Sequence, residues 1–213
     1  MKLLVLGATG RTGQHIVEQG LAKGHQITAL VRDPGKVTPR DGLTLVTGTP
    51  TDAAAVERAA DGTDAILVAL NNPCSSDAPW AKPITTEKIL TEAAQNIIAL
   101  GGKRVVFLSA EGVGDSFDTA PWFMRFMIRK TNLRFAYADH NSAEQAFRAS
   151  DADWTLVRVM GLSNSNKEMS LIVETPTTAR PGMMVRRSAV AGFMLSAAET
   201  GSHIHETPVL SEK

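Results

Sequence analysis

Residues 2–24 read KLLVLGATGRTGQHIVEQGLAKG, and this stretch decides the fold of the chain. Residues 3–6 are a short apolar run, which predicts a fully buried strand of the kind found at the centre of a parallel sheet. A sharp turn over residues 7–10 follows, and the next segment predicts an amphipathic helix that ends at Gly24. The apolar side of that helix is expected to carry Ile16, Val17, Leu21 and Ala22.

Three glycines at positions 7, 10 and 13 lie at the end of this strand and in the first helical turn. Gly7 permits a tight turn, Gly10 lets the backbone approach a pyrophosphate, and Gly13 lets the helix pack closely on the strand. The helix N-terminus offers N–H groups and a positive dipole end to phosphates, with Thr9 in the turn and Thr12 as a further hydroxyl donor. The GxxGxxG spacing departs from the usual GxGxxG, so the strand, the glycines and the helix together predict a dinucleotide site. An ordinary turn between a strand and a helix is the alternative.

The rest of the chain alternates apolar runs with helical patterns. The expected strands are residues 26–31, 43–46, 65–70, 103–108, 154–159, 170–173 and 204–210. The expected helices are residues 53–60, 84–100 and 188–198, and residues 161–169 are expected to be a loop. Pro208 suggests that the last strand lies at a sheet edge. The pattern predicts an α/β fold with a Rossmann-like doubly wound parallel sheet in a single domain over residues 1–213.

Composition narrows the classes of function. The 213 residues carry 22 Lys and Arg against 22 Asp and Glu, and this zero net charge argues against a nucleic-acid partner. Cys74 is the only cysteine, which excludes an internal disulfide and favours a cytoplasmic location; a passive loop thiol is favoured over a reactive one. No apolar stretch reaches the length of a membrane helix, and the N-terminus lacks a signal-peptide layout, so no membrane partner is expected.

Three segments carry a family resemblance. GATGRTG after MKLLVLG, the stretch LSAEGVGD…APWF, and WTLVRV resemble the atypical, NmrA-like branch of the short-chain dehydrogenase/reductase superfamily, to which small NADPH-dependent biliverdin/flavin reductase-like proteins belong. The resemblance covers nearly the whole chain. It implies NADPH as cofactor and a substrate pocket formed by C-terminal loops. Val159-Met160 replace the proline usual in the family, which leaves that pocket unspecified.

The residue that closes the second strand indicates the cofactor. An acidic residue there binds the ribose of NAD, whereas an Arg accommodates the extra phosphate of NADP. Arg32 comes first, in a VRDP context that marks NADPH use in the resembling family, and Arg11 in the glycine turn is placed to assist. Asp33 is the rival, but an Asp before Pro more often starts a turn. NADP (NADPH) is therefore the expected cofactor.

Two further segments are expected to contact the dinucleotide. Asp52 is placed as the N-cap of the helix over residues 53–60, and in the resembling family an Asp here also lies beside the adenine. Leu70 and Asn71 end the fourth strand, at the carboxyl edge where ligands bind in open α/β folds. Their backbone is expected to line the ribose and the nicotinamide.

Ser109, Tyr137 and His140 are the candidate catalytic residues. Ser109 is expected immediately after the fifth strand, where the superfamily's serine holds a substrate carbonyl or lies by the nicotinamide; capping a turn is the alternative. The superfamily's acid is a Tyr with a Lys four residues on, but Tyr137 is followed four residues on by Asn141. Resembling proteins often carry Lys where His140 stands. His140 is either a proton donor or a polar residue on a solvated helix face.

Several side chains have no assigned role. Trp80 is a lid or a packing anchor, with packing favoured. Trp122, Phe123, Phe126, Met127 and Ile128 form an apolar cluster. This cluster covers a flat substrate, forms a subunit contact or packs in the core, which is the commonest fate. His203 and His205 resemble half a metal site but lack a third ligand, so surface histidines are expected and no metal.

The sequence thus predicts an NADPH-dependent oxidoreductase that reduces a small-molecule conjugated acceptor, flavin or quinone, by hydride transfer. Such an acceptor takes its proton from water and needs no dedicated acid. An NmrA-like dinucleotide-binding redox sensor without turnover is the alternative. A sugar-nucleotide epimerase ranks last because that class usually keeps the Tyr–Lys pair. The sequence does not specify an oligomeric state.

Overall fold

The computed structural model describes residues 1–72, 78–82, 84, 88–174 and 182–213, in which strands and helices alternate along the chain. The strands are β1 (Lys2–Leu6), β2 (Gln26–Val31), β3 (Leu43–Thr47), β4 (Ala65–Val68), β5 (Arg104–Ala110), β6 (Asp153–Val159), β7 (Leu162–Ser163), β8 (Leu171–Glu174), β9 (Val185–Arg186) and β10 (Val209–Glu212). The helices are α1 (Arg11–Ala22), α2 (Ala53–Ala60), α3 (Ile89–Ala99), α4 (Trp122–Lys130), α5 (Leu133–Arg148) and α6 (Arg187–Thr200), with short 3₁₀ turns η1 (Pro34–Lys36) and η2 (Gly114–Ser116).

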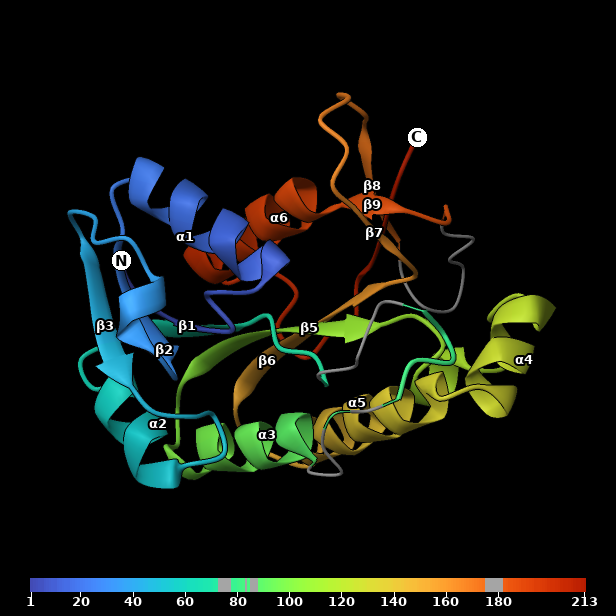
Figure 1. The fold of residues 1–213 in the computed structure, drawn as a ribbon, viewed down its shortest axis with the longest axis horizontal. Coiled ribbons are helices and arrows are strands. Elements are labelled where there is room, and N and C mark those ends of the chain that lie inside the picture. Colours follow the sequence, from blue (N-terminus) through green and yellow to red (C-terminus); the bar gives the residue numbers. More distant parts are fainter. Residues whose placement is uncertain (73–77, 83, 85–87, 175–181) are drawn as a thin grey trace.

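Within the described residues, eight strands form one sheet in the order β3-β2-β1-β4-β5-β6-β10-β8. All neighbours from β3 to β10 pair in parallel, and β8 pairs antiparallel with β10 at the edge. Helices α1 and α6 cover one face, and α2, α3 and α5 cover the other (Figure 1). The predicted Rossmann-like doubly wound sheet is therefore confirmed, because this order requires crossovers on both faces.

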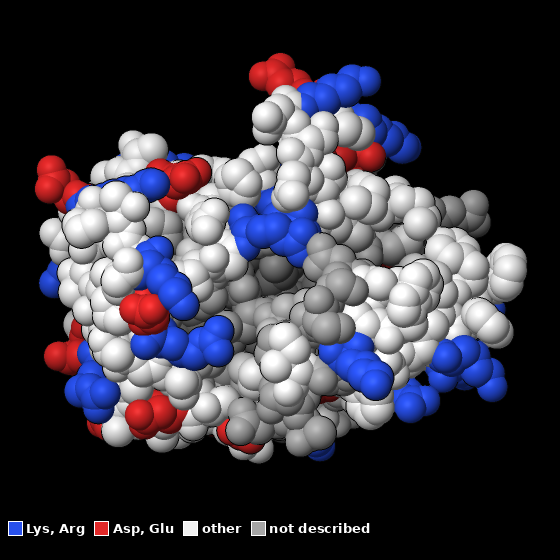
Figure 2. Space-filling model, viewed as in Figure 1, with Lys and Arg blue, Asp and Glu red and all other residues white. Residues whose placement is uncertain are grey.

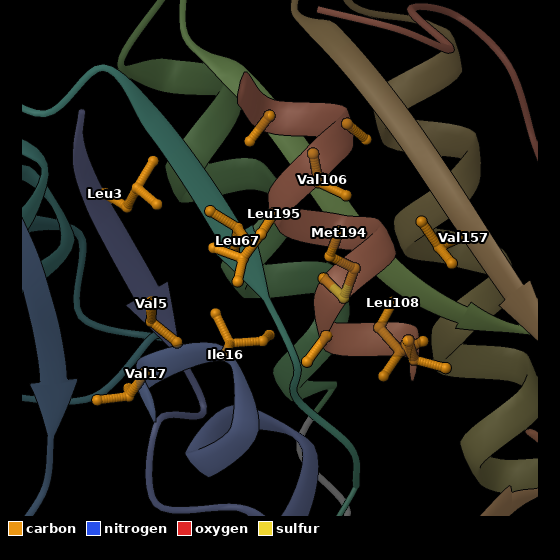
Figure 3. Packing of buried hydrophobic residues seen from close by; sticks show 14 of the residues in the cluster. Leu3, Val5, Ile16, Val17, Leu67, Val106, Leu108, Val157, Met194 and Leu195 are labelled. Atoms are coloured by element: carbon orange, nitrogen blue, oxygen red, sulfur yellow. The ribbon is translucent and has the colours of Figure 1, made fainter. Parts of the chain in front are cut away.

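Each face of the sheet has its own hydrophobic core. Leu3 and Val5 of β1 point toward α1 and α6, where Ile16 and Met194 pack against them (Figure 3). Alternate residues of the same strands point toward α2, α3 and α5. The run over residues 3–6 is apolar at every position because the strand is buried on both sides.

Some element boundaries differ from those predicted. The helix expected over residues 84–100 begins at Ile89, and residues 83 and 85–87 lie outside the described part. The strand expected over residues 65–70 ends at Val68, where the next carbonyl, of Ala69, packs against Gly7. Ala22, placed on the apolar side of α1, is exposed. The expected loop over residues 161–169 contains β7, which pairs with β9.

The last strand is the largest departure. His203 and His205 have left-handed φ values of 58° and 60°, so the chain still turns at residues 204 and 205, where the expected strand over residues 204–210 was to begin. β10 begins at Val209 and lies between β6 and β8, which makes the edge position inferred from Pro208 wrong. The Pro208 carbonyl accepts a hydrogen bond from the Arg158 N–H (2.9 Å), and proline keeps this acceptor although it lacks a donor.

No helix in the described ranges combines the length and the apolar character that crossing a membrane requires.

Candidate functional site

The glycine turn after β1 is closely packed. Gly7 has a φ of 86°, and a Cβ there would collide with the Ala69 carbonyl. A Cβ at Gly13 would collide with the Gly7 carbonyl oxygen, which also accepts the Gly10 N–H at 2.9 Å. The roles predicted for Gly7 and Gly13, in the tight turn and in helix–strand packing, are thus visible as contacts.

The N-terminus of α1 offers an anion site. Gly10 is the N-cap residue, no side chain among the described residues caps this end, and the first turn contains no acidic residue. The Gln14 N–H, bonded to the Gly10 carbonyl at 2.9 Å, is followed by the regular intrahelical ladder. The backbone N–H groups of the residues before Gln14 therefore lie outside the intrahelical hydrogen-bond ladder, as they do at a helix N-terminus that binds phosphate. A dinucleotide pyrophosphate fits this turn.

The other predicted cofactor residues border the same region. Leu70 lies beside Gly7, since its Cδ2 would be 3.3 Å from a Cβ at that glycine. Asn71, Thr9 and Arg11 are exposed, whereas Thr12 is buried (6% exposed) and does not present an open side chain. Figure 2 shows a hollow near the middle of the viewed face, with Lys and Arg side chains beside it.

The end of β2 offers positive charge. Arg32 is exposed directly after this strand, while the Asp33 carboxylate accepts the Gly35 N–H at 3.0 Å and caps η1. Asp33 thus starts a turn, as predicted. A cleft of about 410 Å³ beside this turn is lined by Thr9, Gln14, Lys36 and Arg40 among others.

Asp52 caps α2 as predicted. Its carboxylate accepts the Ala55 N–H at 3.2 Å, and its side chain remains exposed. The predicted contact with an adenine stays a prediction.

Ser109 lies within β5 rather than after it, because the pairing with β6 continues through Ala110 opposite Val159. The serine is 2% exposed, and its hydroxyl donates to Glu144 Oε1 at 2.6 Å. The hydroxyl is thus engaged by a buried carboxylate of α5.

Arg158 joins this carboxylate to a second one. Its guanidinium donates twice to Glu144, at 3.1 Å and 2.6 Å, and lies 2.6 Å from Asp115 Oδ1. Arg158 and Glu144 are fully buried, so their ion pair is charge-assisted and little screened. Sequence analysis did not find this cluster. Its members lie on β6, α5 and η2, and their spacing in the chain carries no signal.

Glu111 lies close enough to this cluster and to Tyr137 for their charges to interact. Burial, together with the negative charge of Glu111, raises the pKa of Tyr137 to about 12. Glu111 follows β5 and is 3% exposed, and burial raises the pKa of its carboxyl group against the opposing effect of Arg158. Glu111 Oε2 has no hydrogen-bond partner in the described part of the chain.

His140 is buried, so the predicted alternative of a solvated helix face is wrong. Its ring packs edge-on against Phe107 at 6.1 Å between centroids. Burial lowers its pKa although Glu144 and Asp139 favour the charged form, and Nδ1 has no partner among the described residues. The ring is therefore mainly neutral near pH 7.

Asp139 explains where α3 begins. Its carboxylate accepts the N–H groups of Leu90 and Thr91, both at 3.0 Å, and the Asn72 side-chain amide at 3.0 Å. The N-terminus of α3 is therefore capped by a residue of α5. Sequence analysis placed the helix start too early because this cap comes from about fifty residues away.

The aromatic residues without an assigned role are mostly exposed. Trp80 and Trp122 are each 74% exposed and Phe126 is 59% exposed, so the favoured packing role is wrong for all three. Within that cluster Ile128 is buried. His203 and His205 lie at the surface, and no metal-binding group of three was found among the described His, Cys, Asp and Glu residues. Cys74 lies outside the described residues.

Comparisons with known proteins agree with this geometry. A family model described as NAD(P)H-binding matches residues 7–200. A (4-alkanoyl-5-oxo-2,5-dihydrofuran-3-yl)methyl phosphate reductase of Streptomyces griseus is 31% identical over 157 residues. That match covers 73% of this chain, and the chain spans less than half (46%) of that relative.

Two solved structures share the fold. A short-chain dehydrogenase/reductase of Veillonella parvula in complex with NADP has a TM-score of 0.80 at 15% identity, covering 99% of this chain and 94% of that one. The anaerobilin reductase ChuY of Escherichia coli O157:H7 has a TM-score of 0.75 at 18% identity, covering 100% of this chain and 97% of that one.

Proposed function

Since the chain belongs to the NAD(P)H-binding family, we propose that it is an NADPH-dependent reductase of a small conjugated acceptor, of the flavin or quinone type. The cofactor, when bound, supplies a hydride. The residues of the chain bind and orient it and exclude water from the reacting faces. The acceptor is expected to be covered by the loops after β6, in the C-terminal part of the chain.

The glycine turn is proposed to hold the dinucleotide. Gly7, Gly10 and Gly13 let the backbone come close to the pyrophosphate, with Thr9 at its edge and Thr12 behind it. Leu70 and Asn71 line the ribose and nicotinamide, and Asp52 lies on the adenine side. The NADP complex of the Veillonella parvula neighbour supports a dinucleotide at such a turn.

Arg32, assisted by Arg11, is proposed to bind the extra phosphate of NADPH. Arg32 is exposed at the end of β2, and Asp33, the residue that favours NAD, is occupied in capping η1. A guanidinium matches a phosphate with two parallel hydrogen bonds, which a ribose hydroxyl cannot use.

The state of Tyr137 is the observation that carries the choice of acceptor. With a pKa of about 12 and no Lys four residues on, Tyr137 is a poor acid near neutral pH. His140 is buried and mainly neutral, and the Ser109 hydroxyl is bonded to Glu144. A conjugated ring accepts hydride and takes its proton from water, so it suits a site without an activated acid.

The name of the curated relative supports a conjugated acceptor. The ring named for the Streptomyces griseus enzyme is an unsaturated dihydrofuran bearing an oxo and an alkanoyl group. Because the chain spans less than half of that relative, the particular substrate is not carried over.

The test is oxidation of NADPH and NADH by the purified protein with FMN, a quinone or a tetrapyrrole as acceptor. We expect turnover with NADPH over NADH. Arg32→Ala should raise the KM for NADPH about tenfold or more and leave that for NADH nearly unchanged. Arg58→Ala, an exposed Arg of α2, is the matched control. Tyr137→Phe should change kcat less than about threefold if the proton comes from water.

Two outcomes would contradict the proposal. Tight nucleotide binding without turnover on any acceptor would favour the redox sensor. Absence of binding of either nucleotide would exclude both functions.

A further inference from the structure

Helix α4 presents large aromatic side chains to solvent. Trp122 and Phe126 are one helical turn apart and are 74% and 59% exposed, while Met124 and Ile128 are buried on the opposite side. Phe135, at the start of α5, is 47% exposed. An exposed aromatic stripe on a helix is uncommon on a chain that contacts only water.

Basic residues border this stripe. We call Trp122, Phe126, Arg125, Arg129, Lys130 and Arg134 the α4 surface. Between Asp118 and Asp139 the sequence holds these four basic residues and no acidic one, although the whole chain is neutral. Positive charge is therefore concentrated at this end of the molecule, where Figure 2 shows Lys and Arg side chains.

Two of the guanidinium groups lie over aromatic rings. Arg129 lies 4.7 Å from the Phe117 ring centroid, and Arg134 lies 4.8 Å from that of Phe135. In this arrangement the positive guanidinium groups themselves lie over the ring faces, where the ring quadrupoles attract them. Trp80, which is also exposed, is tied to the α4–α5 connection because its backbone carbonyl accepts the Asn132 side-chain amide at 2.9 Å.

We propose that the α4 surface docks the protein on an anionic lipid bilayer. Aromatic side chains with Lys and Arg beside them are the composition of helices that lie in the interface plane. Charge complementarity selects the occupant, because a second copy would bring four more positive charges against the first four. Helix α4 projects at one end of the molecule, so it can meet a flat surface (Figure 1).

The test is co-sedimentation of the whole chain with vesicles of phosphatidylcholine and phosphatidylglycerol, in about a 3:1 ratio, and with vesicles of phosphatidylcholine alone. We expect binding to the anionic vesicles only, and release at about 0.5 M salt. The double variant Arg129→Gln/Lys130→Gln should bind about thirtyfold more weakly. Each Lys or Arg near the bilayer contributes about 1 kcal/mol, and about 1.4 kcal/mol corresponds to a tenfold change in affinity. Trp122→Ala/Phe126→Ala should bind at least about tenfold more weakly.

The control is Arg58→Gln/Lys167→Gln, which removes two exposed charges outside the α4 surface and should bind like the unaltered protein. Circular dichroism checks that each variant is folded. Equal binding by all variants, or no binding to anionic vesicles, would overturn the proposal. Self-association in sedimentation velocity that Trp122→Ala/Phe126→Ala abolishes, without vesicle binding, would overturn it in favour of a second copy. Binding of the chain to an acidic protein but not to anionic vesicles would overturn the proposal in favour of an acidic protein partner.

Discussion

Arg158 compensates a buried negative charge near the carboxyl end of the sheet. It is fully buried in β6 and pairs with Glu144, which also accepts the Ser109 hydroxyl. A buried pair contributes little net stability, but removing one partner leaves an uncompensated buried charge. The stability lost on mutating Arg158 therefore reflects the cost of leaving the Glu144 carboxylate buried without a partner, rather than the net stability that the ion pair contributes.

We predict that Arg158→Ala lowers the free energy of unfolding by about 3–5 kcal/mol. Arg148 is the matched control, because it is more exposed and lies 3.5 Å and 3.9 Å from Asp115 and Glu144. Arg148→Ala should cost less than about 1 kcal/mol, as exposed pairs do. Urea unfolding of the three proteins makes the comparison. Equal losses would mean that Arg158 does not offset the charge of Glu144.

His140 predicts how stability depends on pH. Burial lowers its pKa in the folded state, so below a pH of about 6.5 the unfolded chain binds the additional proton. The contribution of His140 to stability is therefore complete above that pH and is lost as the pH falls. Between pH 7.5 and 5.5 the free energy of unfolding should therefore decrease, by at most the roughly 1.4 kcal/mol that one proton allows per pH unit.

The measurement is urea unfolding at both pH values for the unaltered protein and for His140→Gln. The variant should show a smaller decrease on acidification, while His15→Gln, at a partly exposed position of α1, keeps the original decrease. A decrease that His140→Gln leaves unchanged would assign the pH dependence to groups other than His140.

At the scale of elements, the contact between β1 and α1 sets the backbone geometry of the turn that is proposed to bind phosphate. Gly13 packs against the Gly7 carbonyl oxygen, and any Cβ there requires the backbone to move. Gly192 of α6 is also helical, but its Cβ would lie 3.2 Å from Gln19 Oε1, the end of a flexible side chain. Both glycines are helical, but only Gly13 packs against backbone. Comparing an alanine substitution at each therefore distinguishes the effect of backbone packing from that of helix propensity.

We predict that Gly13→Ala weakens NADPH binding at least about tenfold and lowers the free energy of unfolding by about 1–3 kcal/mol. Gly192→Ala should change each quantity much less. Isothermal titration with NADPH and urea unfolding give the two values. Unaltered NADPH affinity in a folded Gly13→Ala variant would mean that the turn does not carry the pyrophosphate.

At the scale of the whole molecule, a dinucleotide would join the ends of several strands. The turn after β1, the end of β2 and the end of β4 come together only when the sheet is folded, so the ligand binds the native state alone. At a concentration one hundred times Kd, such a ligand stabilises by about 2.7 kcal/mol.

For a chain of 213 residues, that free energy raises Tm by about 5–10 °C. We predict this rise with NADPH, a smaller one with NADH at the same concentration, and at most about half of it for NADPH with Gly13→Ala. Differential scanning fluorimetry provides the measurement. Equal rises with both nucleotides would contradict the role proposed for Arg32.

Local features of the fold were predictable from the chain. β2 was predicted with its observed bounds, because its apolar run ends directly at Arg32-Asp33-Pro34-Gly35. The Asp52 cap was also predictable, since donor and acceptor are three residues apart. The glycine turn was recognised because its backbone constraints act between neighbours in the sequence.

The sequence by itself therefore predicted the α/β class, the doubly wound parallel sheet and the glycine turn, but not the position of the last strand. Only the tertiary structure decided the surroundings of the candidate catalytic residues. Ser109, Glu144 and Arg158 meet across two strands and a helix, and Asp139 caps a helix on another segment. Hydrophobic periodicity and turn chemistry act over a few residues, whereas burial and charge pairing depend on which segments pack together. For the same reason, the exposure of Trp122 became visible only in the folded chain.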